Sequence, residues 1–210
     1  ICSTDFDRSP ERAERLKEAL FAVRRDAKDN QQLTFVMLRR WQKCVLGLET
    51  EPCIRRTDAY AKAGRERYPA FAELQSDIET LLSEADATPG LLSSEPPELR
   101  AARAYLDVCF FHPFDDGNGR LARLVLDFVL TKAGLCLQGI GDLFAKPQIA
   151  NDREQLKLFV ETIKTHMAPL GLERDADLNK WSAGGRDASL LKIEERKFDG
   201  TDYKWFDCVC

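Results

Sequence analysis

Apolar residues recur every three or four positions along most of this 210-residue chain, in stretches bounded by clear helix signals. Ser9-Pro10-Glu11 combines an N-cap residue, a proline at the first helical position and an early acid, which is typical of a helix start. The same spacing predicts further helices at about 33–46, 71–82, 97–111, 121–133 and 151–166, and the segment 97–111 is apolar enough to be central. The chain is therefore predicted to be all-α.

The composition argues against a membrane-spanning protein and against a non-specific nucleic-acid binder. Hydrophobic residues make up 44% of the chain and charged residues 31%, and no apolar run approaches the roughly 20 residues of a membrane-spanning helix. The net charge of −4 argues against non-specific binding to nucleic acid. Seven cysteines, an odd number, indicate reduced thiols. With no signal peptide at the Ile-Cys-Ser-Thr start, we expect a cytoplasmic protein, or one delivered into a host cytosol, with neither a membrane nor nucleic acid as partner.

The segment that carries chemistry lies between two apolar helices, at residues 112–123, and reads His-Pro-Phe-Asp-Asp-Gly-Asn-Gly-Arg-Leu-Ala-Arg. Gly117 and Gly119 allow the backbone to turn with its N–H groups facing one point, and a helix that begins there adds partial positive charge. Arg120 and Arg123, three residues apart, are predicted to project from one face and to contact successive phosphates. The segment thus predicts a polyphosphate site.

A base and a metal ligand accompany this predicted anion site. Asp115 and Asp116 offer the hard oxygen ligands that Mg²⁺ binds together with phosphate oxygens. His112 is close to neutral at pH 7 and can accept a proton from an incoming hydroxyl group. These residue types in this order predict nucleotidyl or phosphoryl transfer to a hydroxyl.

The segment resembles the signature of the Fic family, His-x-Phe-x-(Asp/Glu)-Gly-Asn-Gly-Arg-x-x-Arg, at every defined position, and the resemblance extends over residues 10–168. It implies a Fic-type helical bundle that transfers AMP from ATP to a Ser, Thr or Tyr hydroxyl of a target protein. It also implies the following roles: His112 as general base, Asp116 as Mg²⁺ ligand, Gly117, Asn118 and Gly119 as the anion hole, Arg120 and Arg123 on the outer phosphates, and Phe114 as structural anchor.

Two further features of such proteins are expected from the same resemblance. A short β-hairpin flap that aligns the target by strand addition is assigned to residues 53–68. An inhibitory helix of pattern (Ser/Thr)-x-x-x-Glu-(Gly/Asn) has its nearest match at Thr80 to Ala85, where the final residue is wrong and the helix is expected to pack in the core. We therefore predict no self-inhibition within these residues; an inhibitory Glu would be supplied by a partner chain or by residues upstream of Ile1.

Other interpretations stay open at the level of sequence. Relatives on this scaffold transfer UMP, phosphocholine or a phosphate, and Gly119 favours AMP because the kinases usually have Lys there. A non-catalytic interaction module is the remaining alternative. Asp115 is interpreted as a solvated loop acid and His166 as a surface or capping residue. The pairs Arg24-Arg25, Arg39-Arg40 and Arg55-Arg56 are interpreted as solvated faces.

The chain is predicted to contain two parts. Residues 1–168 form the catalytic domain, and residues 169–210 form a polar C-terminal appendage.

Overall fold

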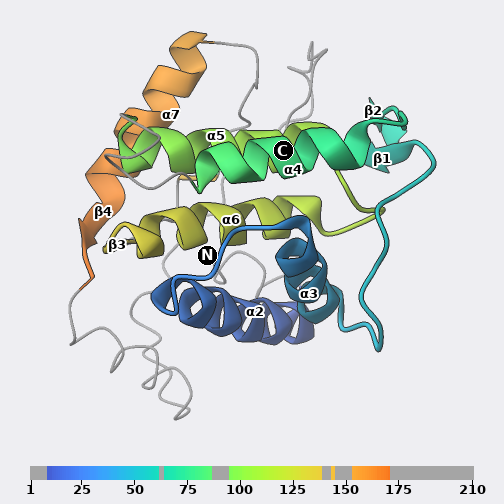
Figure 1. Ribbon diagram of the computed structural model, residues 1–210, viewed down its shortest axis with the longest axis horizontal. Helices are drawn as coiled ribbons and strands as arrows, with labels where there is room; N and C mark the ends of the chain where they lie inside the picture. The colour runs from blue at the N-terminus through green and yellow to red at the C-terminus, as the bar shows by residue number, and fades with distance from the viewer. Residues whose placement is uncertain (1–8, 62–63, 87–94, 139–142, 145–152, 171–210) are drawn as a thin grey trace.

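A computed structural model describes residues 9–61, 64–86, 95–138, 143–144 and 153–170 (Figure 1). Its helices are α2 (Pro10–Lys28), α3 (Phe35–Leu46), α4 (Leu74–Ala85), α5 (Pro97–Phe111), α6 (Asn118–Lys132) and α7 (Arg153–His166). Its strands form two antiparallel pairs, β1 (Ala59–Ala61) with β2 (Glu66–Tyr68), and β3 (Leu135–Leu137) with β4 (Met167–Pro169). The all-α prediction is confirmed, as is a short hairpin within 53–68.

Most helices begin and end close to the predicted residues, because capping residues fix their ends. The Ser9 hydroxyl accepts a hydrogen bond from the backbone N–H of Arg12 at 3.4 Å, and Thr34 caps α3 in the same way. α3 ends at Gly47, which adopts a left-handed conformation with φ of 66°. The start of α4 is later than predicted, because the chain forms a turn after Phe71 and becomes helical only at Leu74.

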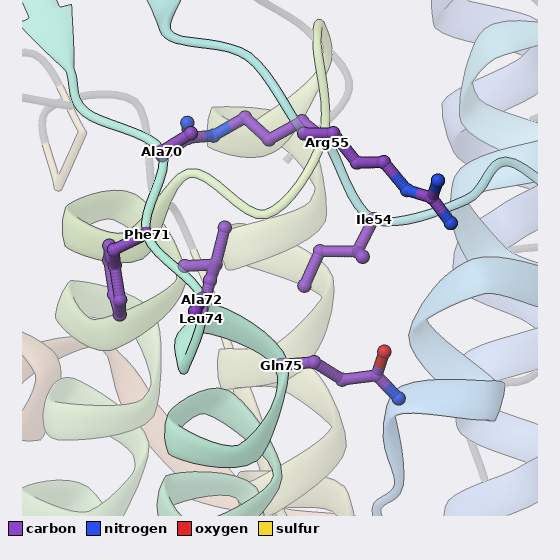
Figure 2. A pocket seen from close by; sticks show the side chains of 8 residues that line it. Ile54, Arg55, Ala70, Phe71, Ala72, Leu74 and Gln75 are labelled. Carbon is purple, nitrogen blue, oxygen red and sulfur yellow. The ribbon is translucent and has the colours of Figure 1, made fainter.

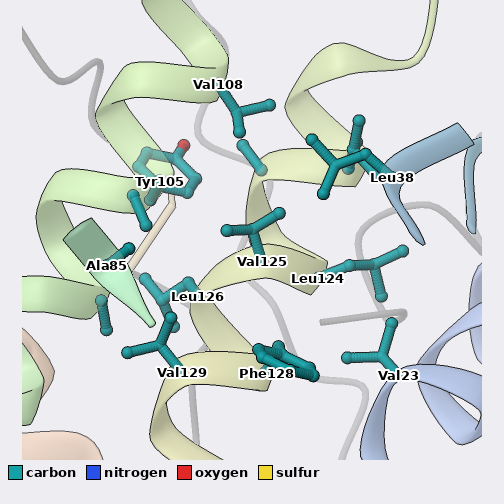
Figure 3. Packing of buried hydrophobic residues seen from close by; sticks show 14 of the residues in the cluster. Val23, Leu38, Ala85, Tyr105, Val108, Leu124, Val125, Leu126, Phe128 and Val129 are labelled. Carbon is teal, nitrogen blue, oxygen red and sulfur yellow. The ribbon is translucent and has the colours of Figure 1, made fainter. Parts of the chain in front are cut away.

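α6 is the most enclosed helix of the fold. It lies between α5 on one side and α2 on the other, and α3 packs beside its N-terminal half (Figure 1). Its residues from Leu124 to Thr131 are all buried, as expected for a helix that is apolar on every side. Figure 3 shows α6 side chains meeting Val23 of α2, Leu38 of α3 and Val108 of α5. The predicted central helix α5 contacts α4, α6 and α7, yet α6 is the true centre.

A buried ion pair joins α2 to this central helix. Asp127 of α6 is 1% exposed and accepts two hydrogen bonds from the guanidinium of Arg24, at 2.8 and 2.9 Å. The prediction that Arg24 belongs to a solvated face is therefore wrong, whereas its neighbour Arg25 is exposed. The sequence places both arginines on one helix, and only the packing of α6 distinguishes them.

The pairing of β3 with β4 was not predicted. It brings the residues after α6 next to the end of α7, with Cys136 opposite Ala168. The predicted boundary at residue 168 thus falls inside β4, and the predicted appendage, from residue 171 onward, lies outside the described residues. Among the residues that the structure describes, no helix is long and apolar enough to cross a membrane.

The cysteines depart in part from the prediction of reduced thiols. Cys44, Cys53 and Cys136 form no disulfide, whereas Cys109 of α5 is disulfide-bonded. The odd cysteine count therefore did not establish that every thiol is reduced.

A substitution at Gly117, the residue before α6, measures how much the turn into this helix depends on glycine. It has φ of +78°, and a Cβ there would lie 2.8 Å from Nε2 of the buried Gln42. We expect Gly117→Ala to lower the free energy of unfolding by about 1–2 kcal/mol from the left-handed conformation alone, before the clash with Gln42 is counted. Urea unfolding followed by circular dichroism measures this loss.

Gly119 gives the matched control, because it lies two residues later within α6 and a Cβ added there would meet no described atom within 4 Å beyond its chain neighbours and the helix backbone. Gly119→Ala is expected to leave stability unchanged or to raise it by roughly 0.5–1 kcal/mol, since alanine is the better helix former. Equal losses in the two variants would contradict this account of the turn.

Candidate active site at the α5–α6 reversal

The chain reverses direction between α5 and α6, and this reversal contains the candidate base. His112 is the C-cap of α5 and adopts a left-handed conformation with φ of 46° and ψ of 59°. Its backbone N–H still donates to the carbonyl of Val108 at 3.0 Å, so His112 makes the last hydrogen bond of the helix. Its left-handed conformation then turns the chain out of the helix. A non-glycine residue in this conformation is uncommon, and here it falls on the one histidine that the sequence singled out.

The imidazole of His112 is held at two points. Nδ1 lies 2.8 Å from the carbonyl oxygen of Cys109, which can only accept, so Nδ1 carries the proton. The ring also stacks on Tyr68 of β2, with ring centroids 3.7 Å apart and planes 15° apart. This tautomer leaves the lone pair of Nε2 as the proton acceptor.

The surroundings of His112 favour its neutral form. Burial lowers the pKa of His112 most, and the positive charge of Arg55 lowers it further. The hydrogen bond to the Cys109 carbonyl and the charges of Glu66 and Asp116 act in the opposite direction, with a net pKa below the usual value of 6.5. At neutral pH the side chain is therefore a base and not a cation.

The loop after His112 is anchored by Phe114. Its ring is 1% exposed and stacks on Phe35 of α3, with centroids 5.6 Å apart and planes 9° apart. Asn118 closes the turn around it, because its Oδ1 accepts from the Phe114 N–H at 3.0 Å and its Nδ2 donates to the Phe114 carbonyl at 2.7 Å. The Asn118 side chain thus holds the loop through both of its polar atoms, and its backbone N–H at the start of α6 is the donor best placed for an anion.

The first turn of α6 has the features of an anion site. Gly117 precedes it with no side-chain cap, so the N–H groups of Asn118, Gly119 and Arg120 begin the helix without intrahelical partners. The absence of a side chain on Gly119 leaves open space beside this turn. An anionic group placed there would meet backbone donors and the positive end of the helix dipole.

Asp116, the expected metal ligand, is 71% exposed at the edge of this turn. One carboxylate oxygen accepts from the Gly117 N–H at 2.6 Å, and the other lies 3.6 Å from Nη2 of Arg120. Within the described residues, no group of three or more His, Cys, Asp or Glu side chains could hold a metal ion. A single accessible carboxylate suits Mg²⁺ that brings phosphate oxygens as its other ligands.

The two arginines of the segment contact different neighbours. The Arg120 side chain is 12% exposed and donates to the carbonyl of Val45, in the last turn of α3, at 3.1 Å. The guanidinium of Arg123 lies 5.1 Å from the ring centroid of Phe144, and its charge opposes the rise to about 12 that burial causes in the pKa of Tyr105. Their spacing of three places both residues on one side of α6, while their guanidinium groups are held by different neighbours.

Arg55 is a residue of this region that the sequence analysis missed. It was predicted to be solvated, but it is 5% exposed. Its guanidinium donates to the carbonyls of Thr57 at 2.8 Å, Pro69 at 2.9 Å, Phe111 at 3.1 Å and His112 at 2.5 Å. No local pattern distinguishes it from the exposed Arg56, since all four acceptors are backbone atoms that any sequence supplies.

A cavity of about 470 Å³ lies beside the base of the β1–β2 hairpin. It is lined by residues of the segments 54–56 and 70–75 (Figure 2). In Figure 2, Arg55 and Ala70 lie along one edge, opposite Leu74 and Gln75 at the start of α4. The cavity is therefore adjacent to the loop that holds His112, because Arg55 belongs to both.

The segment that comes nearest to the inhibitory pattern, Thr80 to Ala85, lies on α4, and none of its described contacts is with the candidate site. Ile78 and Leu82 are buried between α4 and α5, and Thr80 and Glu84 are on the exposed side. The charge of Glu84 acts on Asp107 of α5, whose pKa burial raises to about 6. In the structure, as expected from the sequence, α4 is a packed element of the core.

The chain is similar to a known protein family and to two curated proteins. Residues 32–130 match the Fic/DOC family, a narrower span than the 10–168 expected from the sequence. Two curated relatives are named protein adenylyltransferase fic-1: the Caenorhabditis briggsae protein is 32% identical over 114 residues, 50% of this chain and 22% of its own length. The Caenorhabditis elegans protein is 35% identical over 80 residues, 36% of this chain and 15% of its own length. The chain thus matches less than a quarter of either relative.

Two solved structures are also similar to this chain. A Fic domain-containing signaling protein from Bacteroides thetaiotaomicron superposes with a TM-score of 0.49 at 22% identity, covering 73% of this chain and 56% of that one. Fic-1 from C. elegans, residues 134–508, gives a TM-score of 0.49 at 20% identity, covering 82% of this chain and 52% of that one. Residues 32–130, which include the whole 112–123 segment, thus match the Fic/DOC family.

Proposed function

We propose that this protein transfers AMP from ATP to a Ser, Thr or Tyr hydroxyl of a target protein, releasing pyrophosphate. The observation that carries the proposal is the tautomer of His112, whose Nδ1 proton is engaged by the Cys109 carbonyl while Nε2 remains a base. This base lies in the same reversal as a helix start suited to phosphate oxygens. The name adenylyltransferase on two partial relatives supports the choice of AMP.

In the proposed reaction the target hydroxyl attacks the α-phosphorus of ATP. The hydroxyl proton passes to Nε2 of His112, a new P–O bond forms to the target oxygen, and the bond to the β-phosphate oxygen breaks. General base catalysis of this kind typically contributes about 10²–10⁴-fold to a rate. The proton remains on a side chain whose burial disfavours the cation, so it is readily passed on to solvent after product release.

The phosphates are assigned to the first turn of α6. The backbone N–H groups of Asn118 and Gly119 would hold phosphate oxygens, and Arg120 and Arg123 would bind the outer phosphates after leaving their present contacts with Val45 and Phe144. Asp116 would hold Mg²⁺ through its exposed carboxylate. When bound, the metal would neutralise charge on the leaving pyrophosphate.

The setting of this reaction is also part of the proposal. We place it in a cytosol, either of the producing cell or of a host, with a target protein as the acceptor. Because Glu84 acts on Asp107 and its helix is packed in the core, an inhibitory Glu would come from a partner chain or from residues upstream of Ile1.

Mass spectrometry of candidate targets and of the protein itself tests the activity. With ATP and Mg²⁺ we expect an adduct of AMP mass, and His112→Gln should reduce its formation roughly 10²–10⁴-fold because the base is lost. His166→Gln is the matched control, since the Nδ1 of His166 lies 2.9 Å from the carbonyl of Gln138, far along the chain from the α5–α6 reversal. This variant should label its target normally.

Each remaining outcome of that experiment is informative. Loss of labelling on removal of Mg²⁺, or in Asp116→Ala, would support the assigned metal ligand. An adduct of UMP, phosphocholine or phosphate mass in parallel reactions would replace the proposed donor. No adduct from any donor would favour the non-catalytic alternative.

The pH dependence of the reaction follows from the lowered pKa of His112. A base works when deprotonated, so kcat/KM for AMP transfer should fall with decreasing pH along a limb whose midpoint lies below pH 6.5. Initial rates between pH 5 and 8 measure this limb. A midpoint above pH 6.5 would show that the base carries a raised pKa, contrary to the burial of His112.

A further inference from the structure

We propose that Arg55 is a positioning residue for His112, which ties the base of the β1–β2 hairpin to the C-terminus of α5 and holds the imidazole in its working orientation. The inference rests on the proposed function for the role of His112 as base. It deepens that function by assigning a task to a buried arginine outside the 112–123 segment.

Arg55 binds three successive carbonyls at the end of α5. Its guanidinium donates to Phe111 and His112, and its backbone N–H donates to the carbonyl of Pro113 at 3.0 Å. The last carbonyls of a helix have no intrahelical partners and must be satisfied from elsewhere. Since His112 takes a costly left-handed conformation, these three bonds are what the surroundings supply to keep it there.

The remaining donors of Arg55 bind both ends of the hairpin. Nη1 donates to Thr57, two residues before β1, and Nη2 donates to Pro69, one residue after β2. Tyr68, which precedes Pro69, is the residue that stacks on the imidazole. The guanidinium therefore fixes the separation between the ring of Tyr68 and the backbone of His112, so the two supports of the imidazole depend on one side chain.

Arg55 also sets the charge around His112. The C-terminal end of a helix carries partial negative charge, which favours a histidine cation there. The guanidinium supplies a permanent cation at that end instead and lowers the pKa of His112. The other groups that act on the imidazole are Glu66 of β2, Asp116 of the loop and the Cys109 carbonyl, all of which raise its pKa. Arg55 is thus the cation that opposes them.

Nuclear magnetic resonance of the imidazole groups tests this role without any assay of activity. The chain contains only two histidines, so His166 serves as an internal reference in every titration. In Arg55→Met we expect the pKa of His112 to rise and its Nδ1-protonated tautomer to lose population, while His166 titrates as before. Arg56→Met is the matched control, because this neighbouring arginine is exposed and should leave both histidines unchanged.

Kinetics separate positioning from target binding. If AMP transfer occurs as proposed, Arg55→Met should lower kcat by roughly 10²-fold through misplacement of the base, with a smaller effect on KM for ATP. The acid limb of the pH profile should move to higher pH. If the wild-type protein transfers no AMP, the proposed function fails, and the histidine titrations still decide the role of Arg55.

Arg55→Lys keeps the test decisive where the methionine variant fails to fold. A lysine preserves the charge but has one compact donor group, which cannot reach four carbonyls at once. We expect it to keep the His112 pKa near the wild-type value while the Nδ1 tautomer is lost and kcat falls. A folded Arg55→Met or Arg55→Lys protein with wild-type tautomer, titration and kcat would overturn the proposal.

Discussion

The reversal between α5 and α6 is the constraint on which the candidate site depends. In six residues it must end one helix, start another and project an imidazole, and it does so with a left-handed conformation at each end, at His112 and Gly117. Phe114 anchors the middle of the loop in the core, and the side chain of Asn118 bonds both the N–H and the carbonyl of Phe114. Because every polar backbone group there needs a partner, the loop has little freedom to change its path.

Two helix ends with opposite partial charges meet at this reversal. The C-terminus of α5 is electronegative and the N-terminus of α6 is electropositive, so a base and an anion site can lie side by side in one short segment. Under the dipole of α5 alone, His112 would tend to be a cation. Burial and the charge of Arg55 oppose that tendency, and this balance is what leaves Nε2 able to accept a proton.

Packing in the core fixes the positions of the C-terminus of α5 and the N-terminus of α6. α6 is buried along most of its length and contacts α5, α2 and α3, so its first turn is held as firmly as its middle. Charged groups also contribute to this centre, since Asp127 of α6 is paired with Arg24 and Asp26 of α2 accepts from the indole of Trp41 at 2.8 Å. Removing Arg24 would leave the buried Asp127 carboxylate without its ionic partner and would cost several kcal/mol, so this contact is part of the packing.

The sequence by itself determined the helices and the 112–123 segment, because caps, apolar spacing and glycine positions act between residues close along the chain, whereas the hairpin within 53–68 was expected only from the family resemblance. It did not separate Arg55 from Arg56 or Arg24 from Arg25, and it missed the pairing of β3 with β4. Those outcomes depend on partners that are backbone carbonyls or distant side chains, such as Pro69 for Arg55 and Asp127 for Arg24. Only the tertiary structure brings such partners together, since nothing in the local sequence records which buried acceptor a side chain will meet.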